Sequence, residues 1–247
     1  MPITRVIDKV MLPIGNRPTV DYVVEYCLAA GIRNIIFVVQ RLHSQIEQYY
    51  GTKINIAETY PHLKTAGPAY VTYTVHDQNT LGYGTAPAVY CTQKLLQGVQ
   101  RFVVIAGDAF IYNTSTNPIQ ALIRSNRDTN EVLLGIQIAP QDVTNFGILA
   151  VDDNQHLVNL VERPDSLPHG WKPLANISHY LFSQAIFPEL EAVQPSPNGE
   201  YLITDAILAL ARRTGVTVVP THGLYLDSGN LKAWVAANQF ILENDKY

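Results

Sequence analysis

Carboxylates follow short apolar segments at two places in the chain, where a predicted strand gives way to a turn. The first apolar segment, 102–106, is rich in β-branched residues, and Gly107 and Asp108 follow it directly. A short continuous apolar run of this kind predicts a strand buried on both faces. A carboxylate at the C-terminal end of a buried parallel strand lies where open α/β sheets bind ligands. We therefore predict that Asp108 holds a divalent cation, with an ordinary Gly-Asp turn as the alternative.

The second carboxylate is Asp227, which ends the segment 223–227 and precedes Ser228 and Gly229. Aspartate next to glycine is also typical of turns and helix caps. The residue types alone leave a ligand-binding role and a turn both open.

A glycine-containing stretch, LGYGTAPAV at 81–89, leads into a predicted helix. Gly82 and Gly84 free the backbone to approach a flat or charged ligand closely. A lone G-x-G is a weak motif, and a plain loop before a helix is the alternative. The stretch is thus a candidate ligand loop.

The elements that position these residues can be predicted from hydrophobic periodicity. Strands are expected at 35–39, 69–75, 102–106 and 132–138, and helices at 18–30, 43–50, 85–96 and 117–124. This alternation is typical of a parallel sheet with helical crossovers. Strands at 146–151, 156–161 and 175–182 predict a more antiparallel second half, completed by helices at 184–190, 202–212 and 230–242 and a strand at 216–219. Residues 1–17 show neither period, and we predict one domain over 1–247.

Composition excludes several classes of protein. The chain has 247 residues, of which 47% are hydrophobic and 15% charged, with a net charge of -4. No run of Lys or Arg marks a nucleic-acid surface, so phosphate groups would have to be met by a few placed side chains. Cys27 and Cys91 lack metal-like spacing and suit a reducing compartment. We expect a cytoplasmic protein, because no segment reaches membrane-spanning length and no signal sequence precedes the first strand.

Several short motifs, in order and spacing, resemble those of the sugar-nucleotide pyrophosphorylases over nearly the whole chain. The bacterial UTP–glucose-1-phosphate uridylyltransferases are the most similar branch, and the glucose-1-phosphate thymidylyltransferases are a near second. The motifs are KVMLPI from Lys9, Arg17-Pro18, GYGTA at 82–86, Gly107-Asp108, FGI at 146–148, VERP at 161–164, GE at 199–200, LITDA at 202–206 and DSG at 227–229. Each motif is weak alone, and the resemblance depends on their combination.

The resemblance implies a Rossmann-like mixed-sheet α/β/α sandwich with a nucleotide-binding half, about 1–140, and a sugar-binding half, about 141–247. It implies that UTP, or dTTP, reacts with a sugar 1-phosphate to give a nucleotide sugar and pyrophosphate. A sugar phosphate is largely dianionic near pH 7 and needs no dedicated general base. The protein must position two polyanions and neutralise charge at the α-phosphorus, which Mg²⁺ with one or two carboxylates can do.

The resemblance also assigns roles to individual residues. Asp108 and Asp227 would share the Mg²⁺ ion, Lys9 would contact the nucleotide phosphates, and Arg163 would face the sugar phosphate. Substrate binding would involve Gln78, Gly82, Gly84 and Thr85 on the base side and Gly147, Glu162 and Ser178 on the sugar side. Solvated surface positions are the alternative for Lys9, Glu162 and Arg163. Oligomers are common in the family, and the sequence fixes no number.

The chain departs from the family pattern in three places. The family begins with a buried strand and a glycine-rich phosphate loop, and Met1 aligns just after that loop, so we expect the first strand to be missing. Asp8 replaces a proline, and Arg163 replaces a lysine. The second change puts a planar guanidinium with several fixed N–H donors in place of a compact ammonium. These departures keep two alternatives open: a thymidylyltransferase, and a non-catalytic or truncated homologue that binds nucleotide sugar weakly.

Overall fold

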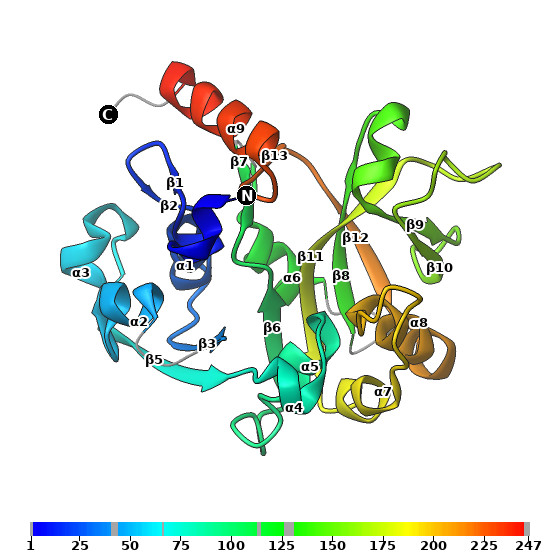
Figure 1. Cartoon of the computed structure of the whole chain (residues 1–247), viewed down its shortest axis with the longest axis horizontal. Coiled ribbons are helices and arrows are strands. Elements are labelled where there is room, and N and C mark those ends of the chain that lie inside the picture. The colour runs from blue at the N-terminus through cyan, green and yellow to red at the C-terminus, as the bar shows by residue number, and fades with distance from the viewer. Residues whose placement is uncertain (1, 41–43, 66, 113–114, 126–130, 245–247) are drawn as a thin grey trace. The chain divides into compact units, whose positions relative to one another are not determined.

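The computed structural model describes residues 2–40, 44–65, 67–112, 115–125 and 131–244, which form two compact units. Unit 1 contains residues 1–73, 106–117 and 223–247, and unit 2 contains residues 74–105 and 118–222. Both chain ends, blue and red in Figure 1, belong to unit 1. The predicted boundary near residue 140 falls inside unit 2, and the prediction of one domain in two halves stays a prediction.

Unit 1 is organised around helix α1 (Thr19–Ala29). Two 3₁₀ helices and a hairpin precede it, and a three-stranded sheet of order β3-β5-β4 follows it. A two-stranded antiparallel pair, β7 with β13, and helix α9 complete the unit. Its elements are η1 (Pro2–Arg5), η2 (Lys9–Met11), β1 (Pro13–Ile14), β2 (Arg17–Pro18), β3 (Asn34–Val39), α2 (Gln45–Tyr50), β4 (Lys53–Asn55), α3 (Ile56–Thr59), η3 (Pro61–Leu63), β5 (Pro68–Val75, whose last two residues belong to unit 2), β7 (Ala109–Tyr112), β13 (Leu224–Asp227) and α9 (Leu231–Asn244).

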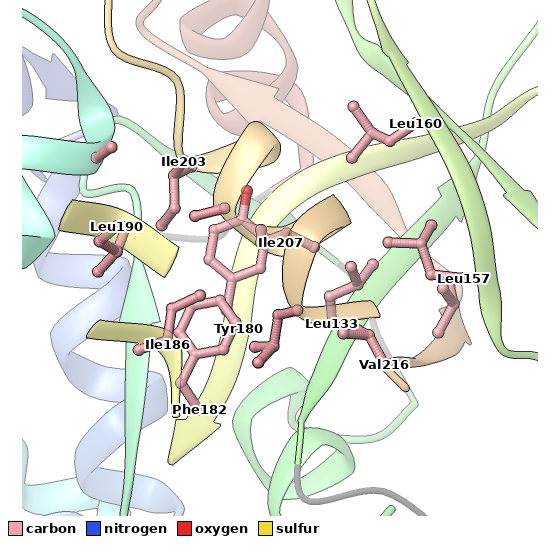
Figure 2. Close-up of a cluster of buried hydrophobic side chains, with 14 of the residues drawn as sticks. Leu133, Leu157, Leu160, Tyr180, Phe182, Ile186, Leu190, Ile203, Ile207 and Val216 are labelled. Carbon is pink, nitrogen blue, oxygen red and sulfur yellow. The ribbon is translucent and has the colours of Figure 1, made fainter. Parts of the chain in front are cut away.

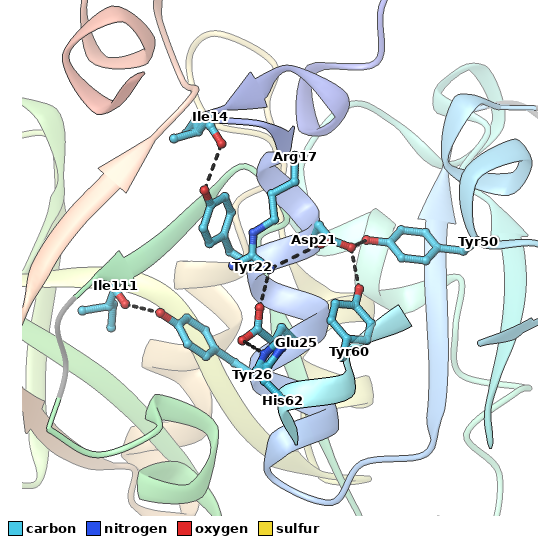
Figure 3. Close-up of polar contacts among 10 residues, drawn as sticks. All are labelled: Ile14, Arg17, Asp21, Tyr22, Glu25, Tyr26, Tyr50, Tyr60, His62 and Ile111. Atoms are coloured by element: carbon cyan, nitrogen blue, oxygen red, sulfur yellow. Dashed lines mark hydrogen bonds and ion pairs between the residues drawn. The ribbon is translucent and has the colours of Figure 1, made fainter. Parts of the chain in front are cut away.

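A polar network on α1 ties the surrounding segments together (Figure 3). The buried Asp21 carboxylate accepts hydrogen bonds from the hydroxyls of Tyr50, at 2.9 Å, and Tyr60, at 2.5 Å. Arg17 forms an ion pair with Glu25, one helical turn beyond Asp21. Buried charges are stable only when they are paired and hydrogen-bonded, and here each charged group has a partner.

Unit 2 is built on a six-stranded sheet in which five strands follow the order β10-β9-β11-β8-β12 and the sixth, β6, also pairs with β11. Strands β6, β8 and β9 pair with β11 in antiparallel fashion, and β12 pairs with β8 in parallel. The elements are α4 (Gln78–Leu81), α5 (Thr85–Tyr90), β6 (Arg101–Ile105), α6 (Pro118–Arg124), β8 (Val132–Gln137), η4 (Pro140–Asn145), β9 (Gly147–Val151), β10 (Leu157–Glu162), β11 (Leu174–Ser183), α7 (Ile186–Ala192), α8 (Ile203–Thr214) and β12 (Thr217–Thr221).

The core of unit 2 lies between one face of this sheet and the helices α7 and α8 (Figure 2). Tyr180 and Phe182 project from β11 and stack with ring centroids 5.3 Å apart. Ile186 from α7 and Ile207 from α8 are fully buried beside them. This apolar layer holds β11 in place, and β11 carries part of the candidate site.

The mixed α/β fold predicted from the sequence is confirmed, and most predicted elements begin or end within one or two residues of the observed ones. Strand β6 corrects the prediction in two ways. It pairs antiparallel with β11, and only Phe102 in it is buried. A short apolar run is compatible with one-sided burial, and nothing local in the sequence specifies the direction of a partner about 80 residues away. Position 43 of the predicted helix 43–50 lies outside the described residues.

Two other features differ from the sequence-based expectation. The helix predicted to reach residue 96 ends at Tyr90, because the side chains of Cys91 and Thr92 donate to the carbonyl oxygens of Ala88 and Val89 and the chain continues in turns. Strand β7 and the β1–β2 hairpin were not predicted. No helix in the described part of the chain is long and apolar enough to cross a membrane.

Candidate functional site

The pairing of β7 with β13 brings the two predicted metal ligands to the same end of these strands. Asp227 is the last residue of β13 and lies opposite Ala109, the first residue of β7, and Asp108 immediately precedes Ala109. The fully buried Ser228 fixes this junction, because its backbone N–H donates to the carbonyl oxygen of Asp108 at 2.9 Å. Two carboxylates 119 positions apart along the chain, by their numbering, therefore meet at one place.

Lys9 completes this cluster. Its ammonium Nζ lies 2.5 Å from the Oδ2 atom of Asp108, and the side chains are 40% and 28% exposed. An ion pair this exposed contributes little to stability, typically about 0–1 kcal/mol. The ion pair therefore contributes little to the stability of unit 1, and both of its charges stay accessible to solvent.

The surroundings of Asp227 disfavour the ionised form of its carboxyl group. The pKa of its carboxyl group is raised, mainly by burial and further by the charge of Asp108, while the N–H of Gly229 and the charge of Lys9 oppose the shift. The N–H of Gly229 donates to Asp227 Oδ1 at 2.6 Å. The carboxylate is therefore held in a fixed orientation next to a like charge.

The carboxylates of Asp108 and Asp227 have the chemistry to hold a divalent cation of the Mg²⁺ type, whereas the Lys9 ammonium, a cation itself, does not. A divalent cation of this type prefers oxygen ligands and is held by one or two carboxylates together with substrate phosphates. A cation between Asp108 and Asp227 would relieve the repulsion that raises the pKa of Asp227. No group of three or more His, Cys, Asp or Glu side chains is arranged to hold a metal ion anywhere in the described ranges. Phosphate oxygens would therefore have to supply the remaining ligands.

The predicted base-contact loop lies in unit 2, between α4 and α5. Gly82 and Gly84 have φ angles of 87° and 143°, which residues with a Cβ rarely adopt. The Oγ1 atom of Thr85 accepts a hydrogen bond of 2.9 Å from the backbone N–H of Ile203. Gln78 is the first residue of α4 and is half-buried. The four predicted base-side residues lie within eight positions of the chain, so their proximity follows from the sequence, and their contact with a base stays a prediction.

The predicted sugar-side residues lie around the end of β10. Glu162 pairs with Gly147 across β9 and β10, and a Cβ added to Gly147 would lie 3.0 Å from Glu162 Oε1. The glycine therefore makes room for the carboxylate. Arg163 follows with a φ of 42° and is exposed, and its N–H donates to the carbonyl oxygen of Phe146 at 3.0 Å.

Glu162 has a raised pKa because the protein around its carboxylate removes solvent, although the residue as a whole is exposed. Thr204 and Arg163 act against this shift, while Glu200 and Asp205 add to it. The Oγ1 atom of Thr204 is buried and makes no hydrogen bond of good geometry within the described residues. The exposed Glu162 carries an acceptor of the kind that sugar hydroxyl groups require, whereas the Thr204 hydroxyl is buried in the protein.

Ser178 lies at a bulge in β11, where the pairing register with β8 shifts. Its φ is 55°, and its N–H donates to Asn176 Oδ1 at 3.1 Å. The amide of Asn176 in turn donates to the hydroxyl of Tyr180 at 2.9 Å. Burial raises the pKa of Tyr180 to about 12, and the charge of Glu162 adds to that shift, so Tyr180 links the bulge to the surroundings of Glu162.

The structure therefore describes two clusters of predicted site residues, each within its own unit. Lys9, Asp108 and Asp227 belong to unit 1, and the base-side and sugar-side residues belong to unit 2. Sequence reasoning missed Ser228 as the residue that ties the first cluster together, since a buried serine in a DSG motif looks like any turn residue. A hollow of about 540 Å³ along α9, lined by Trp234, Val235, Asn238, Gln239, Leu242 and Glu243, contains none of the predicted residues.

Comparisons with known proteins identify the family and the fold of the chain. A family model described as nucleotidyl transferase matches residues 1–244. The UTP–glucose-1-phosphate uridylyltransferase of Haemophilus ducreyi is 28% identical over 258 residues, which cover 96% of this chain and 86% of that protein. A low-salt glycan biosynthesis nucleotidyltransferase of Haloferax volcanii is 31% identical and covers 98% of this chain and 62% of its own length.

Solved structures show the same fold. A UDP-glucose pyrophosphorylase complexed with UDP-glucose superposes with a TM-score of 0.84 at 22% identity, over 99% of this chain and 94% of that chain. A putative glucose-1-phosphate thymidylyltransferase from Bacillus anthracis superposes with a TM-score of 0.79 at 22% identity, over 100% and 91%.

Proposed function

Since the chain belongs to the nucleotidyl transferase family, we propose that it transfers the uridylyl group of UTP to glucose 1-phosphate. The products would be UDP-glucose and pyrophosphate. The names of relatives at 25% to 28% identity over 96% or more of this chain support this choice of substrates. The structures of UDP-glucose pyrophosphorylases support the fold that the reaction uses.

The observation that carries the proposal is the convergence of Lys9, Asp108 and Asp227 at one end of the β7–β13 pair. One ammonium and two carboxylates at a strand end form a site for a phosphate chain and its counter-ion. Transfer of a nucleotidyl group depends on positioning and electrostatic stabilisation and needs little covalent chemistry from the protein.

In the proposed reaction an oxygen of the sugar phosphate attacks the α-phosphorus of UTP, and the bond from that phosphorus to the bridging oxygen of the β-phosphate breaks. Pyrophosphate leaves with the electron pair of that bond. The attacking group is already an anion near pH 7, so no side chain must take a proton from it. Lys9 would offset the negative charge on the phosphates. Asp108 and Asp227 would hold Mg²⁺, which supplies further neutralisation of phosphate charge when bound.

The residues of unit 2 would bind the two organic parts of the substrates. Glu162 would accept hydrogen bonds from sugar hydroxyls, and Arg163 would face the sugar phosphate with its planar guanidinium. Backbone groups of the loop around Gly84 would contact the base. A backbone contact of this kind distinguishes bases by their hydrogen-bonding edge.

The test is turnover of UTP and glucose 1-phosphate, followed as pyrophosphate release, with and without Mg²⁺. Asp108→Asn removes one charge from the cluster with little change in size, and we expect the rate to fall by about 10²–10³-fold. The matched control is Asp153→Asn, an exposed aspartate in a turn, which should leave the rate unchanged. Equal rates for Asp108→Asn and the unmodified chain would refute the site, and absence of turnover in the unmodified chain would refute the activity.

A thymidylyltransferase is the second candidate, favoured by the structural similarity to a protein described as one. Uracil and thymine present the same hydrogen-bonding edge and differ by one methyl group. A panel of UTP, dTTP, CTP and ATP with glucose 1-phosphate would separate the two activities. A larger kcat/KM with dTTP than with UTP would replace the first proposal with this one.

A further inference from the structure

We propose that Tyr201 and His76 are positioning residues that hold the loop Gly82, Tyr83, Gly84 and Thr85 in the conformation that binds the base. The inference rests on the proposed function, because that function gives the loop its ligand. Neither residue touches the reacting atoms in this scheme. Each one acts by fixing backbone groups that lie between them.

Tyr201 fastens the loop through its backbone on both sides of Gly84. Its N–H donates to the carbonyl oxygen of Tyr83 at 2.9 Å, and its carbonyl oxygen accepts from the N–H of Ala86 at 3.0 Å. This pattern makes an isolated parallel bridge between Gly84 and Tyr201. A single bridge outside any sheet has no neighbouring ladder to support it, so its geometry depends on local packing.

The side chain of Tyr201 supplies that packing. A Cβ added to Gly82 would lie 2.7 Å from the Cε2 atom of the Tyr201 ring. A Cβ added to Gly84 would lie 2.6 Å from the Tyr201 nitrogen and would overlap its carbonyl oxygen. The ring therefore lies directly on Gly82, and the backbone lies directly on Gly84. Both glycines of the motif are explained by the approach of this one residue.

His76 holds the opposite end of the loop. It is buried, and its Nε2 atom lies 2.9 Å from the carbonyl oxygen of Gly82. Since a carbonyl oxygen accepts, Nε2 carries the proton in this contact. Removing the donor would leave a carbonyl group without its hydrogen-bond partner in a region with little water, which is unfavourable.

These contacts determine which loop groups remain for a ligand. The carbonyl oxygens of Gly82 and Tyr83, the N–H of Ala86 and the hydroxyl of Thr85 are all engaged by protein. In the described residues the N–H groups of Tyr83 and Gly84 have no protein partner. Two neighbouring donors held on a fixed backbone can meet the carbonyl oxygens of a pyrimidine base. We call the contacts that Tyr201 and His76 make with residues 82–86 the clasp. If the clasp is lost, the two donors remain present but lose their fixed spacing.

The first experiment compares Tyr201→Ala with Tyr201→Phe by steady-state kinetics. The alanine variant lacks the ring that lies on Gly82, and the phenylalanine variant keeps it. We expect Tyr201→Ala to raise KM for UTP about tenfold, a loss of about 1.4 kcal/mol of binding, with kcat and KM for glucose 1-phosphate within about twofold. Tyr201→Phe should restore the KM for UTP. Tyr70→Ala, which removes an exposed ring from β5, is the control for loss of a tyrosine.

The second experiment does not depend on turnover. Amide hydrogen exchange at Ala86, whose N–H is bonded to Tyr201, should be faster in Tyr201→Ala than in Tyr201→Phe or the unmodified chain. His76→Leu should accelerate exchange in the same loop, and His76→Gln, which keeps a donor, should not. Thermal unfolding of each variant separates loop opening from global loss of structure.

The outcomes distinguish this inference from the proposed function. If the unmodified chain shows no turnover with any nucleotide, the proposed function fails, and the exchange data still decide whether the clasp exists. If turnover is normal but Tyr201→Ala changes neither KM for UTP nor exchange at Ala86, the inference is overturned. If Tyr201→Ala does not fold, the pair His76→Leu and His76→Gln carries the same comparison. A fall in kcat together with a rise in both KM values would indicate general damage to the protein and would also overturn the inference.

Discussion

The two units of the molecule place their candidate residues in different physical ways. In unit 1 the predicted groups are charged side chains, an ammonium beside two carboxylates, and they lie within reach of solvent. In unit 2 the predicted base-contact loop is a stretch of backbone held between His76 and Tyr201, and the core cluster that includes Ala86 is apolar. We expect the function of the first arrangement to be lost when a side chain loses its charge. We expect the function of the second to be lost when a glycine gains a Cβ.

The charged cluster should give the largest effect on activity with almost no effect on stability. Lys9→Met keeps the length of the side chain and removes its charge, and we expect kcat to fall by about 10²–10³-fold because phosphate charge is no longer offset. The free energy of unfolding should change by less than about 1 kcal/mol, since the Lys9–Asp108 pair is exposed. Pyrophosphate release and denaturant unfolding measure the two quantities.

The control for this change is Lys232→Met, an exposed lysine on α9. It should alter neither quantity. A large loss of stability in Lys9→Met would contradict the comparison, because it would make Lys9 a structural residue.

The backbone clasp should be broken by a single methyl group. Gly84→Ala adds a Cβ where Tyr201 leaves no room, at a φ of 143°, and we expect kcat/KM for UTP to fall by about a hundredfold, or about 2.7 kcal/mol. Gly98→Ala is the matched variant, because Gly98 also has a positive φ, 81°, but an added Cβ meets nothing within 4 Å. Gly98→Ala should cost about 1 kcal/mol of stability from backbone strain and leave kinetics intact. Similar kinetics for the two variants would show that packing against Tyr201 is irrelevant.

The burial of His179 in unit 2 should appear as sensitivity to acid. His179 is buried, with Nδ1 at 2.7 Å from the carbonyl oxygen of Ile177 and Nε2 without a hydrogen-bond partner in the described residues. Burial lowers the pKa of His179 from 6.5 to about 4. Between pH 6.5 and about 4, the His179 side chain therefore binds a proton in the unfolded chain but not in the folded chain. The free energy of unfolding consequently falls as the pH is lowered through this range.

From this shift we expect about 2 kcal/mol of the free energy of unfolding to be lost at pH 5 relative to pH 8. The measurement is urea unfolding at both pH values, for the unmodified chain and for His179→Gln, which should lose most of that difference. His156→Gln, at a half-buried histidine that forms an isolated β-bridge with Thr217, should keep it. An unchanged pH dependence in His179→Gln would assign the acid sensitivity to other groups.

The smallest effect is expected at the bulge in β11. Ser178→Gly removes a Cβ from a left-handed conformation, φ 55°, which should stabilise the fold by about 0.5–1 kcal/mol after the entropy of glycine in the unfolded chain is included. KM for glucose 1-phosphate should rise only if the hydroxyl binds sugar. Thermal unfolding with parallel kinetics separates the backbone contribution of Ser178 from its side-chain contribution.

Much of the fold followed from the sequence because long apolar runs and helical periods are local signals. The helices α1, α8 and α9 and the strands β8 to β11 were predicted on that ground and are confirmed. The β1–β2 hairpin was missed because strands of two residues carry no period. The direction of β6 was predicted wrongly because its partner β11 lies far along the chain.

The candidate site was predictable to a different extent. Asp108 and the glycines of the loop could be singled out from residue type and position. The roles of Lys9, Asp227 and Glu162 came from family resemblance, and they stay predictions. Tyr201, His76 and Ser228 escaped sequence reasoning because they act through packing and backbone hydrogen bonds. Such contacts have no residue signature, since many side chains could in principle make them.

The start of α1 has a further consequence for Lys9. Thr19 bonds the carbonyl oxygen of Leu12 through both its N–H and its hydroxyl, and the hydroxyl of Tyr22 donates to the carbonyl oxygen of Ile14 at 2.9 Å. The backbone three and five residues after Lys9 is therefore held by hydrogen bonds to helix α1. If Lys9 contacts phosphate as proposed, its ammonium must move from Asp108 by rotation about the bonds of its own four methylene groups.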